Sequence, residues 1–210
     1  MSIDYTLYLV TDRQLVGDKD FYASIEEALL GGVTLLQLRE KSISTLEFHK
    51  IAQDIKRIAN KYKVPFIIND RLDIALSVDA DGLHIGQDDM PVSIARKLLG
   101  PDKVIGVSAS NIKEALLAEQ LGADYLGIGA IFATGTKRDA HHTDLAELSR
   151  IRAATHIPIV AIGGINESNV PDIMKTGVNG VAVVSAILDK DNVNVAAQNL
   201  RRLIDSQKRK

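Results

Sequence analysis

Short runs of valine, isoleucine and leucine alternate with amphipathic stretches along the whole chain, and turn-forming residues separate the two kinds of segment. Several of the short runs are apolar at every position, which is typical of parallel strands covered on both faces. The pattern predicts strands at residues 5–10, 35–39, 65–68, 82–85, 104–107, 125–128, 158–162 and 181–184.

The stretches between the predicted strands carry the periodicity and the start signals of helices. Ser44 and Glu47 form a capping box ahead of a helix whose apolar positions recur as far as Tyr62. Asn111 and Glu114 repeat this device before a helix that Gly122 closes. Further helices are predicted at residues 22–30, 72–78, 92–99, 145–154, 170–175 and 195–204.

This alternation predicts an α/β protein, a single (β/α)8 TIM barrel that spans residues 1–210. Eight strand–helix units in a chain of this length average about 26 residues each, which is close to the minimum for such a barrel. A doubly wound open sheet is the competing architecture. Eight units of nearly equal length favour closure, and no linker or low-complexity segment indicates a domain boundary.

Composition narrows the class of protein. The chain has 46% hydrophobic and 25% charged residues, as expected of an ordinary soluble domain, and it contains no cysteine, which excludes thiolate catalysis, disulfides and cysteine-based zinc sites. A net charge of −2 argues against a general nucleic-acid binder. The sequence has no apolar run of the roughly 20 residues that a membrane span needs, and it does not open with a secretory signal. We therefore expect a cytoplasmic protein without nucleic-acid or membrane partners; a homo-oligomer is left open.

Candidate chemistry lies where the predicted strands end, because catalytic groups of (β/α)8 barrels lie at the carboxyl ends of strands. Gln37, Arg39 and Lys41 alternate along one face at the end of the second strand. On an isolated strand they would form an ordinary solvated face, but a closed barrel has no such edge. Two converging cations then need an anion, and phosphate or diphosphate fits both.

Carboxylates follow the next two strands. Asp70 ends the third strand and Asp88 and Asp89 follow the fourth. Each could simply cap the following helix. Together, beside the cations, they indicate a hard cation such as Mg²⁺, which one or two carboxylates and a substrate phosphate usually hold. Spacing leaves the choice between Asp88 and Asp89 open. His84 is interpreted as a structural residue inside the barrel or beneath the site.

The fifth and sixth strand ends add polar groups at the barrel mouth, and the seventh and eighth predict a second anion site, lined by backbone rather than by cations. Ser108 follows the fifth strand, and a long loop with two threonines, a glycine and Lys137 follows the sixth. The paired glycines 163 and 164 end the seventh strand, and small residues around Ser185 end the eighth. Bare backbone N–H groups of this kind form the usual phosphate cradle of a barrel.

These residues resemble the thiamine-phosphate synthase family over nearly the whole chain. The resemblance rests on ordered motifs at the strand ends: YLVTD (8–12), QLREK (37–41), INDR (68–71), GLHIGQDD (82–89), GVS (106–108), TGTK (134–137), IGGI (162–165) and VVSAI (183–187). It implies a transferase that joins hydroxymethylpyrimidine diphosphate to a thiazole phosphate, giving thiamine phosphate and pyrophosphate. It also implies a dissociative course in which diphosphate leaves before the thiazole nitrogen attacks, with positioned charge as the catalyst.

The resemblance further implies a role for each matched residue. Asp70 and Asp89 would hold Mg²⁺, which resolves the choice left open by spacing. The residues expected to contact the pyrimidine diphosphate are Gln37, Leu38, Arg39, Glu40, Lys41, Asn69, Ser108 and Lys137, of which Arg39, Lys41, Ser108 and Lys137 would be catalytic. Those expected to bind the thiazole phosphate are Thr134, Gly135, Thr136, Gly164, Val184 and Ser185. Ala133 stands where the family often has proline, which removes no contacting group.

Two alternative functions differ from this one. A related barrel tautomerises a thiazole phosphate without joining it to anything, and its members favour a histidine after the sixth strand. Ala130 and Ile131 occupy that segment here. A phosphate-sensing barrel without catalysis would have no evident need of two anion sites and paired aspartates.

Overall fold

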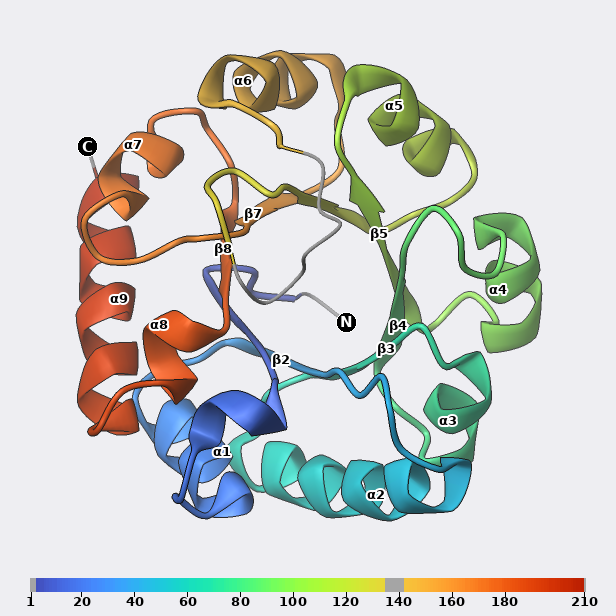
Figure 1. Cartoon of the computed structure of the whole chain (residues 1–210). Helices are drawn as coiled ribbons and strands as arrows, with labels where there is room; N and C mark the ends of the chain where they lie inside the picture. The colour runs from blue at the N-terminus through green and yellow to red at the C-terminus, as the bar shows by residue number, and fades with distance from the viewer. Residues whose placement is uncertain (1–2, 135–141, 210) are drawn as a thin grey trace.

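A computed structural model of the chain describes residues 3–134 and 142–209, and its parallel strands close into a barrel ringed by helices (Figure 1). The strands follow one another around the barrel in sequence order. They are β1 (Leu7–Val10), β2 (Leu35–Leu38), β3 (Phe66–Asn69), β4 (Gly82–Ile85), β5 (Val104–Ala109), β6 (Tyr125–Ile128), β7 (Ile159–Ile162) and β8 (Gly180–Val183).

The helices on the outside are α1 (Phe21–Leu30), α2 (Thr45–Tyr62), α3 (Leu72–Ser77), α4 (Val92–Leu99), α5 (Ile112–Gln120), α6 (Leu145–Ala154), α7 (Val170–Met174), α8 (Ser185–Leu188) and α9 (Val193–Lys208). A 3₁₀ helix, η1 (Arg13–Val16), follows β1. The sequence did not predict η1 and α8, because single turns of four residues show no helical periodicity.

Closure of the sheet decides between the two predicted architectures. β1 pairs in parallel with β2 on one side and with β8 on the other, so that Tyr8 lies opposite both Leu35 and Ala182. An open doubly wound sheet would leave two unpaired edges. The predicted (β/α)8 barrel is therefore confirmed.

The predicted helix starts are also present. The Ser44 side chain accepts a hydrogen bond from the Glu47 amide at 3.2 Å, and that of Asn111 accepts one from the Glu114 amide at 3.0 Å. α5 ends at Gln120 with Leu121 as its C-cap, and Gly122 follows with φ 95°, the left-handed conformation that glycine adopts readily. Local capping thus sets where α2 and α5 start.

Two apolar cores lie on the two sides of the strands. The larger fills the space between the strands and the helices and contains residues such as Leu36, Leu38, Ile55 and Ile128. The smaller fills the inside of the barrel and consists of Tyr8, Val10, Leu35, Ile67, Tyr125, Val160 and Ala182. Because neighbouring strand residues point to opposite faces, each all-apolar strand serves both cores.

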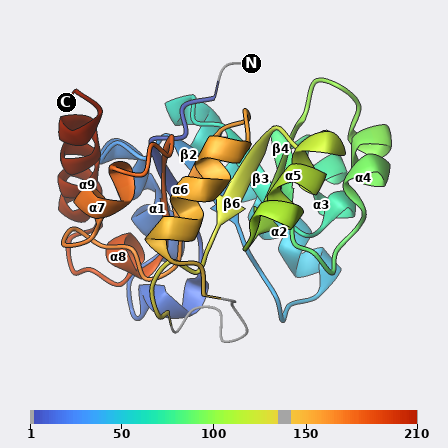
Figure 2. The ribbon, with the colours of Figure 1, turned by 90° about the horizontal axis from the view of Figure 1, so that it is seen from above.

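The first and the last described residues lie at the same end of the barrel, away from the loops that follow the strands (Figure 2). The Nζ of Lys208 in α9 donates to Oγ1 of Thr6, just before β1, at 2.7 Å. The opposite end is therefore left to the connections from strand to helix. Among the described residues, no helix has the length and apolar character needed to cross a membrane.

Candidate active site

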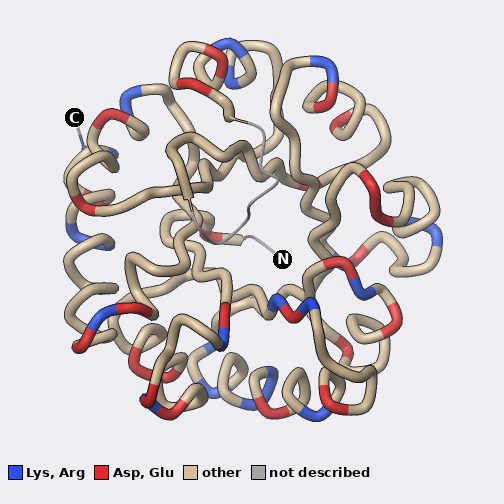
Figure 3. The backbone as a smooth tube through the Cα atoms, in the orientation of Figure 1, with Lys and Arg blue, Asp and Glu red and all other residues tan. Residues whose placement is uncertain are grey.

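The end of β2 supplies the cations predicted for the rim. In Figure 3 the charged positions of the segment after β2 lie beside the barrel opening, whereas most other charges lie on the outer helices. Lys41 forms an ion pair with Asp70, which comes from the next strand. Within residues 3–134 and 142–209, the guanidinium of Arg39 has no hydrogen bond or ion pair. One cation of the pair is thus positioned by a carboxylate, and the other is available to an anion.

Asp70 holds an unusual backbone conformation at the end of β3. Its φ is 61°, a left-handed value that few residues other than glycine, asparagine and aspartate adopt. Its amide donates to the carbonyl of His84 on β4 at 2.8 Å, which holds the turn against the neighbouring strand. Arg71 is the residue directly before α3, and no side-chain hydrogen bond caps the start of this helix. The capping role considered for Asp70 is therefore not observed.

Asp89 occupies the corresponding place after β4. Its Oδ2 accepts from the Gly86 amide at 2.7 Å, and it does not cap α4, which starts after Pro91 without a side-chain cap. Burial raises the pKa of Asp89 and the neighbouring Asp70 carboxyl raises it further, against the lowering effects of the Gly86 hydrogen bond and Lys41. Asp88 is exposed, whereas Asp89 is half-buried beside Asp70. The geometry therefore favours Asp89 as the partner of Asp70.

The adjacent carboxylates fit a divalent cation. Two carboxylates held side by side repel each other, and a divalent cation removes that repulsion. No group of three or more acidic or histidine side chains gathers into a metal site in the described part of the chain. Two protein carboxylates are nevertheless a normal share for Mg²⁺, which takes its other ligands from water and substrate phosphate.

Two predicted contact residues point away from these groups. Leu38 is fully buried in the outer core, and the Glu40 carboxylate pairs with Arg13 of η1 at 2.7 Å. Both belong to the opposite face of β2 from Gln37 and Arg39, as the strand alternation requires. The structure thus does not bring the side chains of Leu38 and Glu40 to the rim with the other candidates. The Arg13–Glu40 ion pair instead fixes the path of the segment that carries Arg39 and Lys41.

The predicted polar residues on the inner faces of the strands do reach the rim. Asn69 at the end of β3 is 7% exposed, and its Nδ2 is buried without a hydrogen-bond partner among the described residues. Burying such an amide without a partner costs free energy unless a ligand or a water molecule accepts its hydrogen bond. Ser108 of β5 is half-buried, and its Oγ lies 2.9 Å from Nε2 of His84. His84 is buried inside the barrel, as the sequence indicated.

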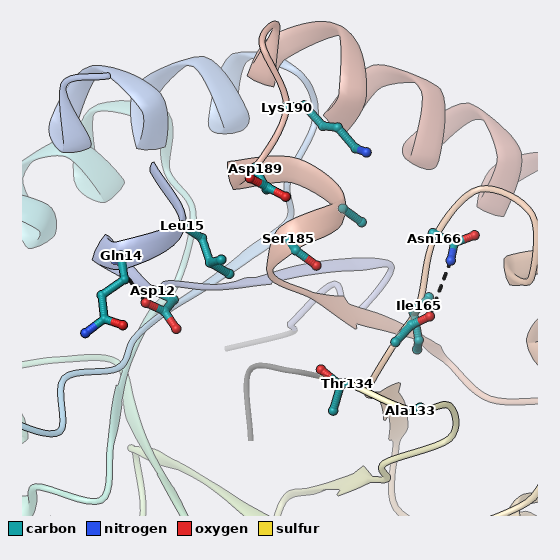
Figure 4. A pocket seen from close by; sticks show the side chains of 12 residues that line it. Asp12, Gln14, Leu15, Ala133, Thr134, Ile165, Asn166, Ser185, Asp189 and Lys190 are labelled. Atoms are coloured by element: carbon teal, nitrogen blue, oxygen red, sulfur yellow. Dashed lines mark hydrogen bonds between the residues drawn. The ribbon is translucent and has the colours of Figure 1, made fainter. Parts of the chain in front are cut away.

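A cavity of about 800 Å³ opens between the loops after β1, β6, β7 and β8 (Figure 4). Thr134, Gly164 and Ser185 line it, and the Thr134 and Ser185 side chains face one another across it in the figure. Gly164 has φ 63°, and a Cβ on it would lie 2.6 Å from the carbonyl oxygen of Ala133. Only glycine therefore lets the loop after β7 pack against the loop after β6. Val184, the half-buried residue before α8, lies next to Ser185.

Three predicted site residues, two for the thiazole phosphate and one for the pyrimidine diphosphate, lie beyond what the structure describes. Gly135, Thr136 and Lys137 fall within residues 135–141, outside the described residues. Conversely, the cavity wall contains polar residues to which the sequence assigned no role: Asp12, Gln14, Asn166, Asp189 and Lys190. Asp12 lies two residues after the end of β1, within a motif that the resemblance used, so the rule that sites form at strand ends would have found it.

Comparisons with known proteins show the family to which the chain belongs. A family model described as thiamine monophosphate synthase matches residues 7–187. Thiamine-phosphate synthase of Clostridium tetani is 55% identical over 199 residues, which cover 95% of each chain. That of Clostridium acetobutylicum is 55% identical over 197 residues, covering 94% of this chain and 93% of the relative.

A solved structure supports both fold and family. Thiamine phosphate pyrophosphorylase from Pyrococcus furiosus superimposes with a TM-score of 0.90 at 41% identity, over 97% of each chain. A geranylgeranylglyceryl phosphate synthase from Thermoplasma acidophilum, 14% identical with a TM-score of 0.70, shares the fold alone. The closed barrel and the sequence similarity over most of the chain give one conclusion: the chain belongs to the thiamine monophosphate synthase family and has the transferase activity of thiamine biosynthesis.

Proposed function

We propose that the barrel joins its two substrates between two anion sites, with Mg²⁺ at the first. The pyrimidine diphosphate binds at the ends of β2, β3, β4 and β5, and the thiazole phosphate binds in the cavity between the loops after β6, β7 and β8. The separation of a cation-rich rim from a cavity lined by glycine and hydroxyl groups supports this division.

The diphosphate site gains its affinity from groups that have few partners in the protein. Arg39 offers a guanidinium that can grip phosphate oxygens in a bidentate manner. Lys41 adds a point charge that Asp70 holds in place, and Asn69 Nδ2 is a buried donor without a partner in the described chain. An anion bound at this rim would accept hydrogen bonds from all three groups.

Asp70 and Asp89 would hold the metal ion. When bound, Mg²⁺ would neutralise part of the charge on the departing diphosphate. The protein's own contribution is to keep Arg39, Lys41 and Ser108 fixed around the leaving group, so that little reorganisation accompanies the build-up of charge. Lys137 would add a further cation from the loop after β6.

The reaction requires no protein nucleophile. The bond between the pyrimidine methylene carbon and the diphosphate oxygen breaks, and that oxygen keeps the electron pair. The thiazole nitrogen then donates its lone pair to the methylene carbon. Gly164, Ser185 and Thr134 would hold the thiazole phosphate so that the nitrogen faces this carbon, and closing the barrel mouth would exclude water as a competitor.

The observation that carries the proposal is the placement of Lys41, Asp70 and Asp89, from three successive strand ends, in one charged cluster. We expect pyrophosphate release only when both substrates and Mg²⁺ are present. Reactions that lack one component each, and one with excess EDTA, are the controls. Pyrophosphate release that persists without a divalent cation would reject the metal assignment.

We also propose a cytoplasmic location, because both substrates are phosphorylated and do not cross membranes unaided. Fractionation of cells followed by immunodetection tests this. Recovery in the membrane or extracellular fraction would contradict it.

A further inference from the structure

A continuous chain of hydrogen bonds crosses the inside of the barrel beneath the rim. Nε2 of Gln37 on β2 donates to the Tyr8 hydroxyl on β1 at 2.6 Å, and this hydroxyl lies 2.8 Å from the Tyr125 hydroxyl on β6. The Tyr125 hydroxyl lies 2.9 Å from Nδ1 of His84, whose Nε2 lies 2.9 Å from Oγ of Ser108. The chain thus joins two residues of the proposed pyrimidine diphosphate site through three residues to which the mechanism gives no role.

The interior is shaped to hold this chain. Tyr8 and Tyr125 are 1% and 0% exposed. A Cβ at position 106 would lie within 2.4 Å of the Tyr125 ring, and one at position 127 would lie 3.0 Å from the His84 ring. Glycine at both positions leaves the space that the two rings occupy. Polar groups this deeply buried must satisfy one another, so the chain has few permitted arrangements.

When the His84 imidazole is neutral, counting protons reduces these arrangements to two ordered ones. Burial raises the pKa of Tyr8 and of Tyr125 well above the ordinary value, so each phenol keeps one proton and donates one hydrogen bond. If donation runs from Gln37 towards Ser108, Tyr125 donates to Nδ1 of His84 and the imidazole carries its proton on Nε2.

That order determines what the rim offers to a ligand. The imidazole then donates to Ser108, whose own hydrogen is free to point to an anion. If the Gln37 amide turns over and the order reverses, Ser108 donates inwards and presents only lone pairs, which repel an anion. The two ends are therefore linked, because turning the Gln37 amide also turns the Ser108 hydroxyl.

We propose that this chain is directional, and that Tyr8, Tyr125 and His84 are positioning residues that make the Ser108 hydroxyl a donor to the diphosphate. An anion at the rim selects the order that runs from Gln37 to Ser108, with His84 in its Nε2–H tautomer. The proposal rests on the proposed contact of Ser108 with diphosphate. It extends the site from the rim into the barrel interior.

A double-mutant cycle separates action through Ser108 from general support of the barrel. We expect Tyr125→Phe to lower kcat/KM about tenfold, the size of one net hydrogen bond to a charged group. In a Ser108→Ala background the same substitution should change kcat/KM less than about twofold, because the residue it acts through is gone. Additive losses in the double variant would overturn the proposal.

Tyr5→Phe is the matched control. The Tyr5 ring packs against the Tyr125 ring, with centroids 5.0 Å apart, but its hydroxyl is not a member of the chain. We expect unchanged kcat/KM for this variant. If it loses as much activity as Tyr125→Phe, the effect is one of packing and the proposal fails. If Tyr125→Phe does not fold, Tyr8→Phe breaks the same chain one bond further away and enters the same cycle.

The tautomer of His84 gives a second readout that does not depend on turnover. Imidazole ¹⁵N chemical shifts of the whole protein with Mg²⁺ and pyrophosphate should place the proton on Nε2, and Tyr125→Phe should shift population to the other tautomer. A proton on Nδ1 in the pyrophosphate complex would refute the direction. If Ser108→Ala alone leaves kcat/KM unchanged, the proposed diphosphate contact fails, and the imidazole shifts still decide whether the chain is ordered.

Discussion

Replacing Asp89 by asparagine separates the catalytic value of this carboxylate from its effect on folding. In the structure the carboxylate is half-buried beside Asp70, and its pKa is raised, first by burial and then by Asp70. A raised pKa means that ionisation is unfavourable in the folded chain. Asparagine has the same shape, and its carbonyl oxygen can keep the 2.7 Å hydrogen bond from the Gly86 amide. We therefore expect Asp89→Asn to fold with a Tm no lower than that of the unsubstituted protein.

The same change should remove most of the activity. Loss of one preorganised electrostatic group typically lowers kcat by ~10²–10³, equivalent to about 3–4 kcal/mol. It should also weaken stabilisation by Mg²⁺ with pyrophosphate. A ligand at a hundred times its Kd stabilises the folded state by about 2.7 kcal/mol. For a chain of this size that corresponds to a rise in Tm of roughly 5–10 °C, which the variant should largely lose.

Two measurements check this prediction. Steady-state pyrophosphate release gives kcat, and thermal unfolding with and without Mg²⁺ and pyrophosphate gives the ligand-induced shift in Tm. Asp88→Asn is the matched control, because it removes the same charge from the adjacent, exposed position. The reasoning is refuted if Asp89→Asn keeps kcat within threefold, or if Asp88→Asn loses as much as Asp89→Asn does.

Two further substitutions and the pH dependence of Asp89→Asn test other properties of the site. Lys41→Ala removes both a proposed diphosphate contact and the ion-pair partner of Asp70, so kcat should fall by ~10²–10³; steady-state kinetics that show a loss below threefold would make Lys41 a scaffold residue. Gly164→Ala places a Cβ 2.6 Å from the Ala133 carbonyl oxygen at a φ of 63°, so KM for the thiazole phosphate should rise more than KM for the pyrimidine diphosphate, and equal changes would contradict the assignment of this loop. In the ligand-free protein, the raised pKa of Asp89 does not lower the free energy of unfolding at pH values below the ordinary pKa of 3.8, but it lowers that free energy increasingly as pH rises through the folded-state pKa. The Tm of Asp89→Asn relative to the unsubstituted protein should therefore increase with pH. A difference in Tm that stays constant across an acid titration would show that the pKa of Asp89 is not perturbed.

Much of the architecture could be predicted from local signals. Apolar runs located every strand to within a few residues: the run at 158–162 became β7 (Ile159–Ile162), and that at 5–10 became β1 (Leu7–Val10). Capping signals located the starts of α2 and α5. A Ser or Asn side chain at such a start accepts a hydrogen bond from the amide three residues later in the sequence, and this local contact does not depend on the rest of the fold. The α9 helix extends past its predicted limits of 195–204 to Val193–Lys208; at its C-terminal end the polar residues 205–208 carry no apolar periodicity.

The candidate site followed from the same local pattern up to a definite point. The alternation of side chains along β2 correctly grouped Gln37, Arg39 and Lys41, and the same alternation places Leu38 and Glu40 on the other face. The family motif at residues 37–41 implies contact with the pyrimidine diphosphate for consecutive residues, and consecutive residues lie on both faces of the strand. The Arg13–Glu40 ion pair, which joins residues of two different strand–helix units, shows what Glu40 contacts on that other face.

The sequence by itself determined the order of strands and helices, the points at which helices start, and the residue types delivered to each strand end. These depend on interactions between residues close together in the chain, and they are therefore encoded locally. The local pattern left three things to the tertiary structure: that the sheet closes, that Asp89 rather than Asp88 lies beside Asp70, as only the family resemblance had indicated, and that Gln37, Tyr8, Tyr125, His84 and Ser108 share one line of hydrogen bonds. Each depends on which faces of distant strands meet across the barrel, and strands that are apolar on both faces carry no local sign of the side that turns inward.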